Sequence, residues 1–263
     1  MSDRIVKTND ELIDQYFKEC ENHILQKYSN AVYPIYGANE HKEPEHIGSC
    51  FIVEKDKIKY LITAHHVLEH LESTNLYIGT LNRLIPIRGE SAYFNKEHKI
   101  DMAAIRLESS IDLNYFLTDF IYNDSMRHNY DYGIFLGYPN TRNKKVAKKR
   151  KIEILAYLDK FNYNSDIFKS LKIKQDDYFA INYYSKKVVN SDGLIGSYIQ
   201  PEGISGCPLM MLNITANSYR YNTLPEAQIC GVVVEGHADK KLVLALRSKF
   251  IFILINKLEN SLV

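Results

Sequence analysis

Apolar and polar residues alternate in many short stretches of this chain. A period of two residues over four to eight positions is typical of β-strands with one buried face. The pattern predicts strands at residues 31–36, 47–54, 58–64, 76–79, 84–87, 92–94, 101–107, 132–139, 152–158, 178–184, 209–212, 229–234 and 242–246. Turn-forming and polar residues separate these stretches. Many short strands with turns between them favour a barrel or a sandwich over a parallel α/β sheet.

Helical spacing of apolar residues occurs near both ends of the chain. Between residues 9 and 28 the apolar positions 12, 13, 16, 17, 24 and 28 form one stripe, and Asn9 or Asp10 is the expected N-cap. Residues 250–258 are apolar and contain no Gly or Pro, which predicts a second helix. Residues 65–71 have the spacing of one or two helical turns. We therefore expect a helical extension over residues 1–30, a central domain over residues 31–247, and a helix within residues 248–263 packed on that domain.

Composition and charge narrow the function classes. The 263 residues are 45% hydrophobic and 25% charged, which is usual for a globular protein in water. The net charge of +1 gives no argument for nucleic acid or an anionic membrane as partner, and the basic residues between 142 and 151 are expected to be a solvated loop. The first residues lack the apolar core of a signal peptide, and the four cysteines form no Cys-x-x-Cys pair. These features predict free thiols and a cytoplasmic location.

A serine between two glycines is the strongest candidate for chemistry. In residues 203–208 the sequence is Gly-Ile-Ser-Gly-Cys-Pro, and glycines on both sides allow a tight turn that presents the Ser205 hydroxyl beside free backbone N–H groups. Two other segments supply partners for it. One predicted strand ends in Thr63-Ala64-His65-His66, and another begins with Asp101 followed by apolar residues. The chain thus contains a histidine, an aspartate and a serine in that order, each in a strand or turn setting.

These three segments resemble those of the chymotrypsin-like (trypsin-fold) serine proteases, and within them most closely the bacterial high-temperature-requirement branch without a PDZ domain. Further matches are the strand beginning Gly48-Ser49-Cys50-Phe51, the segment Gly137-Tyr138-Pro139, and Gly231-Val232-Val233. The resemblance covers about residues 31 to 250. It implies a mainly β fold of two barrels, the first at about residues 31–125 and the second at about residues 126–247, with the N-terminal and C-terminal helices added.

The resemblance also implies a role for each matched residue. Ser205 would be the nucleophile, His66 the general base, and Asp101 the group that fixes the tautomer of the His66 ring. The oxyanion hole would be formed by the backbone N–H groups of Gly203 and Ser205. The substrate pocket would be framed by Ile199, Val234, Glu235 and Gly236. The implied protein is a serine endopeptidase that needs no cofactor or metal and acts on a protein or peptide. Its activity would be restrained by a narrow substrate range, a regulatory protein partner, or an oxyanion loop that becomes ordered only on activation. Stand-alone bacterial relatives of this kind are often effectors in conflict or defence systems.

Some residues depart from the family pattern. Ile204 stands where digestive proteases have an aspartate that pairs with a newly cut N-terminus, so activation by such a cut is not expected. Ile199 in place of a carboxylate argues against cleavage after Lys or Arg and favours an apolar or small residue before the cut. Cys50 and Cys207 replace glycines near the serine. A disulfide or an oxidation site is conceivable there, but two small buried thiols that fill space are the favoured interpretation.

Two other interpretations of the sequence stay open. Residues 66–70 read His-x-x-Glu-His, which matches the inverted zinc-peptidase signature, in which two histidines on one helix hold a metal. That interpretation needs a third ligand on a helical domain. The second is a trypsin-fold protein that binds partners and no longer cuts. Loss of His66, Asp101 or Ser205 would be its usual sign, and all three are present.

Overall fold

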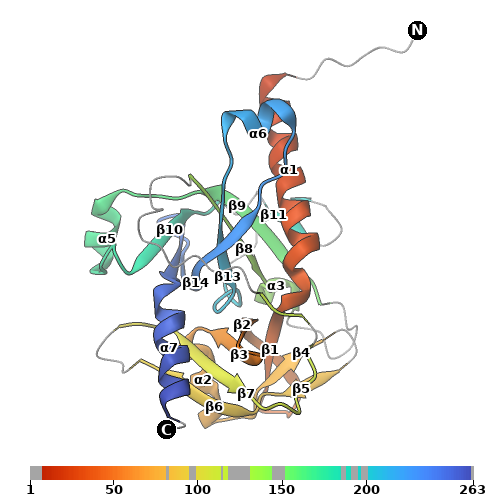
Figure 1. Ribbon diagram of the computed structural model, residues 1–263, viewed down its shortest axis with the longest axis vertical. Helices are drawn as coiled ribbons and strands as arrows, with labels where there is room; N and C mark the ends of the chain where they lie inside the picture. Colours follow the sequence, from red (N-terminus) through yellow and green to blue (C-terminus); the bar gives the residue numbers. More distant parts are fainter. Residues whose placement is uncertain are drawn as a thin grey trace.

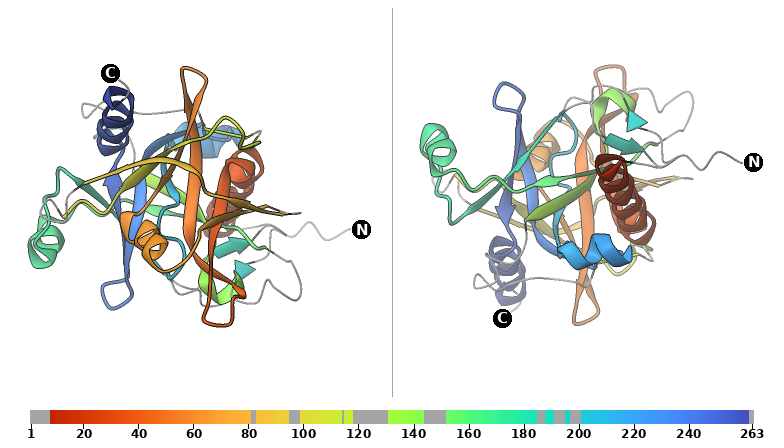
Figure 2. Two further views of the ribbon diagram at one scale, coloured as in Figure 1. Left: turned by 90° about the horizontal axis from the view of Figure 1, so that it is seen from below. Right: turned by 90° about the horizontal axis from the view of Figure 1, so that it is seen from above.

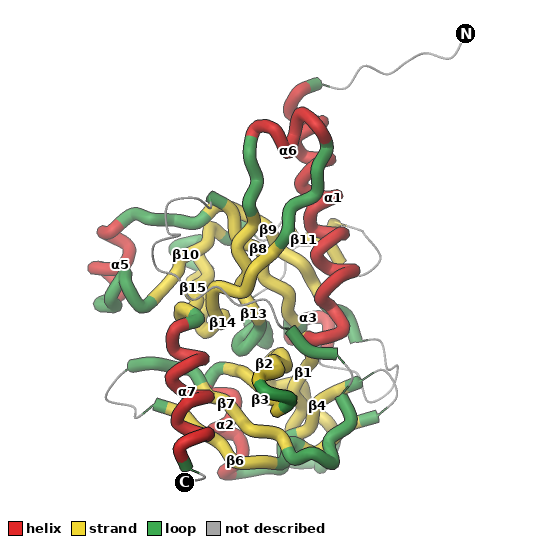
Figure 3. Tube along the Cα trace, in the orientation of Figure 1, coloured by secondary structure: helices red, strands yellow, loops and turns green. Residues whose placement is uncertain are grey.

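A computed structural model describes residues 8–80, 83–94, 99–113, 115–117, 131–143, 152–184, 188–190, 195–196 and 201–261. Two antiparallel sheets make up most of it, and each curls into part of a barrel (Figures 1 and 3). The mainly β double-barrel architecture expected from the sequence is thus observed. Ile199 and the basic residues from 144 to 151 lie outside the described residues.

The first sheet has the strand order β5-β4-β1-β2-β3-β7-β6. Its strands are β1 (Val32–Ala38), β2 (Pro44–Lys55), β3 (Ile58–Thr63), β4 (Tyr77–Gly79), β5 (Leu84–Pro86), β6 (Gly89–Tyr93) and β7 (Ala103–Leu107). Between β3 and β4 lies the short helix α2 (His65–Glu69), followed by one 3₁₀ turn, as the sequence predicts for this stretch. Large side chains that face the interior, such as Phe51 and Tyr60, are fully buried.

The second sheet has the order β10-β15-β14-β13-β8-β9-β11-β12. Its strands are β8 (Tyr132–Gly137), β9 (Leu155–Lys160), β10 (Tyr178–Asn182), β11 (Val188–Asn190), β12 (Ile195–Gly196), β13 (Pro208–Leu212), β14 (Ala227–His237) and β15 (Leu242–Arg247). Short helices connect several of them: α3 (Asn140–Asn143), α5 (Ser165–Leu171) and α6 (Ala216–Tyr221). Helices α5 and α6 are not predicted by the apolar pattern, because each spans fewer than two full turns.

Helix α1 (Asn9–Tyr28) packs against β9 and β11 of the second sheet. Tyr16, Cys20, Ile24 and Tyr28, four residues apart, form its buried face. The expected stripe was wrong at its start, because Leu12 and Ile13 are 50% and 40% exposed. The N-cap is also one position earlier than expected: Thr8 forms a capping box with Glu11, which satisfies two backbone donors at once.

Helix α7 (Lys249–Asn260) follows β15 of the second sheet and packs on β6 and β7 of the first. Its buried residues Phe250, Ile251, Leu254, Ile255 and Leu258 lie on one face. Near its end, Glu259 pairs with Lys55 at 2.7 Å. Helices α1 and α7 lie on different sides of the strands (Figure 2). Among the helices in the described part of the chain, none is both long and apolar enough to cross a lipid bilayer.

Candidate active site

The antiparallel pairing of β3 with β7 brings His66 and Asp101 together. Thr63 at the end of β3 lies opposite Ala103 at the start of β7, so the residues just beyond these two positions are neighbours. Asp101 accepts two hydrogen bonds from His66: the backbone N–H donates to Oδ1 at 2.9 Å, and ring Nδ1 lies 2.6 Å from Oδ2. Two contacts to one carboxylate fix both the position and the rotation of the ring. A proton on Nδ1 leaves Nε2 with a lone pair that can accept a proton.

The contact shifts the pKa of both groups. Burial by itself lowers the pKa of His66, but the hydrogen bond and charge of Asp101, together with the charges of Glu69 and Glu235, raise it above its ordinary value. Burial by itself raises the pKa of Asp101, and the hydrogen bonds and charge of His66 lower it by more. Asp101 therefore stays ionised at neutral pH, and His66 is more basic than a free histidine.

Ser205 lies in the turn that precedes β13 of the second sheet. It lines the same cleft as His66 and Asp101, a hollow of about 500 Å³ between the two barrels. The Ser205 hydroxyl donates a hydrogen bond to the Val234 carbonyl of β14 at 3.3 Å. In this conformation it is directed at Val234 rather than at the His66 ring. The structure thus brings the three predicted residues into one cleft, with the serine hydroxyl donating to a backbone carbonyl.

The carbonyl groups before and within this turn are held by partners in the protein. The Glu202 carbonyl accepts from the Asn140 N–H at 2.8 Å, and the Ile204 carbonyl accepts from the Cys207 N–H at 3.0 Å. A trans peptide directs its C=O and N–H to opposite sides. The N–H groups that follow these carbonyls, those of Gly203 and Ser205, therefore point away from those partners, and neither donates a hydrogen bond to a described residue.

Ser49 of β2 supports the turn from the first barrel. Its N–H donates to the Ser205 carbonyl at 2.8 Å and its hydroxyl donates to the Gly203 carbonyl at 2.9 Å. The same hydroxyl accepts the N–H of Tyr138 at 3.0 Å. Ser49 is fully buried, so all of these bonds are shielded from water. Sequence reasoning placed Ser49 in a matching strand but did not identify this contact.

Both glycines of the turn have backbone angles that favour glycine, with φ of +88° at Gly203 and +91° at Gly206. A Cβ at Gly206 would lie 2.0 Å from the Ser49 carbonyl oxygen and 2.2 Å from Thr63 Oγ1. We expect Gly206→Ala to lower the free energy of unfolding by more than about 2 kcal/mol, since it combines backbone strain with a clash against backbone. Urea unfolding measures the change.

Asn222→Ala is the control for this prediction. Asn222 also has positive φ, +50°, but it is exposed at the end of α6, so alanine there meets the strain without the clash and loses only an exposed hydrogen bond to Glu19 of 3.2 Å. We expect it to cost about 1 kcal/mol. Equal losses for the two variants would show that the space around Gly206 is not tight.

Three of the four predicted pocket residues, Val234, Glu235 and Gly236, are consecutive in β14 and line the cleft with Ser205. The fourth, Ile199, lies outside the described residues. Sequence reasoning missed other residues that line the cleft: Lys99, Ile173, Tyr178, Pro201 and Glu202. The Tyr178 hydroxyl donates to the Lys99 carbonyl at 2.9 Å, which joins the segment before Asp101 to the second barrel. No sequence pattern signals this pairing, because the two residues are far apart in the chain.

The four cysteines are free and buried, so no disulfide joins Cys50 and Cys207. Burial raises the pKa of both thiols well above the ordinary value, which disfavours the reactive thiolate. The space-filling interpretation of these two residues agrees with this environment.

The zinc signature at residues 66–70 does not form a ligand cluster. Nδ1 of His66 contacts Asp101, and His70 lies beyond the end of α2, in the 3₁₀ turn. Within the described ranges, no three His, Cys, Asp or Glu side chains come together in a way that would hold a metal ion.

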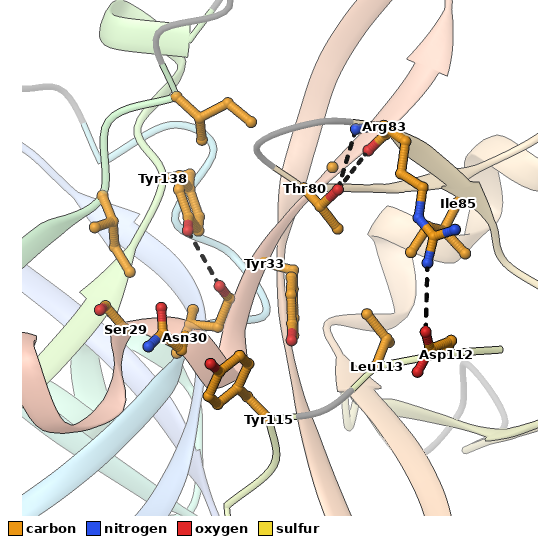
Figure 4. A pocket seen from close by; sticks show the side chains of 14 residues that line it. Ser29, Asn30, Tyr33, Thr80, Arg83, Ile85, Asp112, Leu113, Tyr115 and Tyr138 are labelled. Atoms are coloured by element: carbon orange, nitrogen blue, oxygen red, sulfur yellow. Dashed lines mark hydrogen bonds and ion pairs between the residues drawn. The ribbon is translucent and has the colours of Figure 1, made fainter.

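A second, larger cavity of about 670 Å³ lies between β1, β5 and the segment just before β9 (Figure 4). Tyr33, Tyr115 and Tyr138 contribute rings to it, and Arg83 and Asp112 form an ion pair of 3.9 Å at its edge. None of the three candidate catalytic residues lines it. Tyr138 connects it to the turn described above through the Ser49 hydroxyl.

Comparisons with known proteins identify the fold and no closer relative. No protein-family model matches the sequence, and no curated protein is significantly similar to it. By contrast, 418 chains of solved structures match its fold. One of them, described as the structure of GrC, has a TM-score of 0.55 and 12% sequence identity over 88% of this chain and 94% of that one. The fold is therefore trypsin-like, and at this identity the likeness extends to the fold alone.

Proposed function

We propose that this chain is a serine endopeptidase that uses Ser205, His66 and Asp101. The observation that carries the proposal is the two-point contact between His66 and Asp101, at 2.6 and 2.9 Å, in the same cleft as a serine beside two N–H groups without a partner among the described residues. A structural ion pair would explain the contact alone. It would not explain why this histidine, whose side chain is 43% exposed, shares one cleft with the unpaired donors next to Ser205.

In the proposed reaction, Ser205 Oγ attacks the carbonyl carbon of the scissile peptide and its proton passes to Nε2 of His66. The N–H groups of Gly203 and Ser205 donate to the oxyanion that forms, and Asp101 stabilises the charged ring. His66 then gives the proton to the leaving amine, which departs and leaves an acyl-enzyme. Water attacks the ester with His66 again as the base, and the acid product and free Ser205 are released. No step draws on a cofactor or a metal.

The finer parts of the proposal rest on the sequence resemblance. They are membership of the high-temperature-requirement branch, a bacterial source, a cytoplasmic location, a polypeptide substrate, and control by a protein partner. An effector role in bacterial conflict or defence belongs to the same group. The trypsin-like fold and the near-neutral charge of the chain agree with a polypeptide as substrate rather than a nucleic acid.

One observation favours a second candidate, a trypsin-fold binding protein without activity. The Ser205 hydroxyl donates to Val234 and not to His66, so the step from serine to histidine needs a change of rotamer. Catalytic hydrogen bonds often form only when substrate binds, so we favour the enzyme.

A fluorophosphonate probe distinguishes the two candidates, because it labels only an activated serine. We expect the wild-type protein to be labelled and Ser205→Ala not to be. Ser49→Ala is unsuitable as a control because it supports the turn, whereas Ser170→Ala changes an exposed serine on α5 and should label like the wild type. A folded, concentrated wild-type sample that takes up no label would favour the binding protein. Loss of peptide cleavage with EDTA, with no effect of Ser205→Ala, would favour the zinc peptidase.

The wall of the cleft predicts which residue precedes the cut. A Cβ at Gly236 would lie 2.4 Å from Cγ and 2.5 Å from Cβ of Pro201, so the proline ring rests directly on the strand. The ring therefore fills part of the space between the turn and β14 that a long side chain would need. We expect peptides with Ala or Gly at this position to be cleaved at least about tenfold more efficiently than those with Leu, Phe, Lys or Arg.

A peptide library with one varied position measures this preference as kcat/KM. Pro201→Ala removes the ring from the wall, and the ratio of Leu to Ala cleavage should then rise. A clear preference of the wild type for Lys or Arg would contradict the prediction.

A further inference from the structure

His46 is a buried histidine that the proposed reaction does not use. It lies in β2 with 3% of its surface exposed, and its ring meets the edge of Tyr36 with 5.5 Å between ring centroids. Nδ1 lies 2.5 Å from the side-chain oxygen of Asn140, and Nε2 has no hydrogen-bond partner in the described part of the chain. Burial lowers the pKa of His46 to about 4, by more than the contacts with Asn140 and the Gly48 backbone raise it, so the ring is neutral at neutral pH. With an amide oxygen facing Nδ1, the ring proton is on Nδ1 and donates to Asn140.

Asn140 is in direct contact with the turn that precedes Ser205. Its backbone N–H donates to the Glu202 carbonyl at 2.8 Å. A Cβ at Gly203 would lie 2.5 Å from Asn140 Oδ1 and 2.7 Å from its N, so Asn140 packs against the Gly203 Cα with no space between them. The peptide between Glu202 and Gly203 can rotate only if Asn140 moves or its hydrogen bond breaks.

This contact crosses between the two barrels. His46 is in β2 of the first sheet, whereas Asn140 begins α3 after β8, and Gly203 lies in the turn before β13 of the second sheet. Ile204 is buried among apolar side chains and offers no carboxylate that an ion pair could hold. The orientation of the Glu202–Gly203 peptide therefore depends on neutral hydrogen bonds.

We propose that His46 is a positioning residue, which through Asn140 holds the Glu202–Gly203 peptide so that the Gly203 N–H faces the cleft. The proposal rests on the proposed function, because it assigns His46 a role in forming that oxyanion site. Without the His46 bond the Asn140 side chain is free to rotate, and the peptide spends part of its time with the N–H turned away. Only the fraction with the N–H in place stabilises the oxyanion, so kcat falls while ground-state binding along β14 is retained.

The test compares His46→Phe, which keeps a ring and loses the donor, with His46→Asn, whose amide can place a donor near the position of Nδ1. We expect His46→Phe to lower kcat by about 10- to 100-fold with KM within about twofold of wild type, and His46→Asn to restore most of the loss. Binding of a peptide aldehyde, whose hemiacetal oxygen occupies the oxyanion site, should weaken by the same factor. Asn140→Ala should have a similar effect, and the double variant His46→Phe with Asn140→Ala should lose no more than either alone.

His41→Phe is the matched control, because His41 lies in the exposed turn before the same strand. It should leave kcat unchanged. If His46→Phe lowers the melting temperature but not kcat, or if the double variant loses the product of the two single effects, His46 has only a structural role and the proposal fails. If the wild type neither cleaves peptides nor takes up the fluorophosphonate probe, the proposed function and this inference both fail. An active, labelled wild type with a fully active His46→Phe overturns the inference alone.

Discussion

Replacing His66 with alanine is expected to lower kcat for peptide cleavage on the order of 10⁶-fold, because Ser205 is then left without a base. Asp101 is ionised but held against the histidine ring, and the Val234 carbonyl that the hydroxyl contacts is not a base. KM should change much less than kcat. Single-turnover measurements with a chromogenic ester and a peptide separate binding from the chemical step.

His65→Ala is the control for this prediction. His65 is adjacent in sequence, but its ring stacks on Tyr93 at 4.5 Å between centroids and is not part of the cleft lining. It should keep kcat within a fewfold of wild type. If His65→Ala removed activity and His66→Ala did not, the register of the motif would be wrong by one residue.

Replacing Asp101 with asparagine is expected to lower kcat by about 10⁴-fold near neutral pH. The amide keeps the size of the carboxylate and can still accept the His66 N–H. Its NH₂ group would donate to Nδ1, which leaves the ring proton on Nε2, where the serine proton has to go. The folded structure should be nearly unchanged, so thermal unfolding monitored by circular dichroism is the accompanying measurement. A variant that keeps more than a tenth of wild-type kcat would show that Asp101 does not set the tautomer.

The same variant changes the pH dependence in a defined direction. His66 acts as a base only when neutral, so kcat/KM should rise with pH through the pKa of His66 and be lost below it. In the wild type, Asp101 raises this pKa above its ordinary value. In Asp101→Asn the raising effect of the charge is gone and burial still lowers the pKa, so the midpoint should move to lower pH. A midpoint that does not move, or moves upward, would contradict the assignment.

Strands with one buried face could be predicted from sequence because their period of two is a local property. The hairpin of β2 and β3 and the strand β7 appear where the alternation places them. Helix α1 was predicted with its correct bounds, and its buried face was predicted at Tyr16, Ile24 and Tyr28 but not at its start, where Leu12 and Ile13 are exposed. Whether Leu12 is covered depends on where the second barrel ends, and that is a tertiary property. The short helix α6 depends on a capping box at Thr215 and Ser218 rather than on an apolar stripe, so the stripe criterion missed it.

In the candidate site, too, the residues in local motifs could be predicted and those held by contacts between distant segments could not. His66, Asp101 and Ser205 each belong to a short motif that is read within a few residues, and the structure places all three in one cleft. The residues that hold the turn, Ser49 and Asn140, carry no such local signal. Their positions follow from the packing of β2 and of the segment after β8 against residues 202–205, which brings together parts of the chain 62 to 156 residues apart. Hydrogen bonds of this kind become visible only in three dimensions.

Each terminal helix packs on the barrel that is farther from it in the sequence, and this affects the order in which the chain can fold during synthesis. Helix α1 ends at Tyr28 but covers β9, which begins at Leu155, while β6 and β7 end by Leu107 but are covered by α7, which begins at Lys249. A ribosome adds about 5–20 residues per second, so the first sheet waits seconds for α7, whereas α1 is made before the sheet that it covers. The first barrel cannot mature before the second has been made. A nascent chain therefore has no finished cleft, and the proposed protease becomes active only after nearly all of its described structure has left the ribosome.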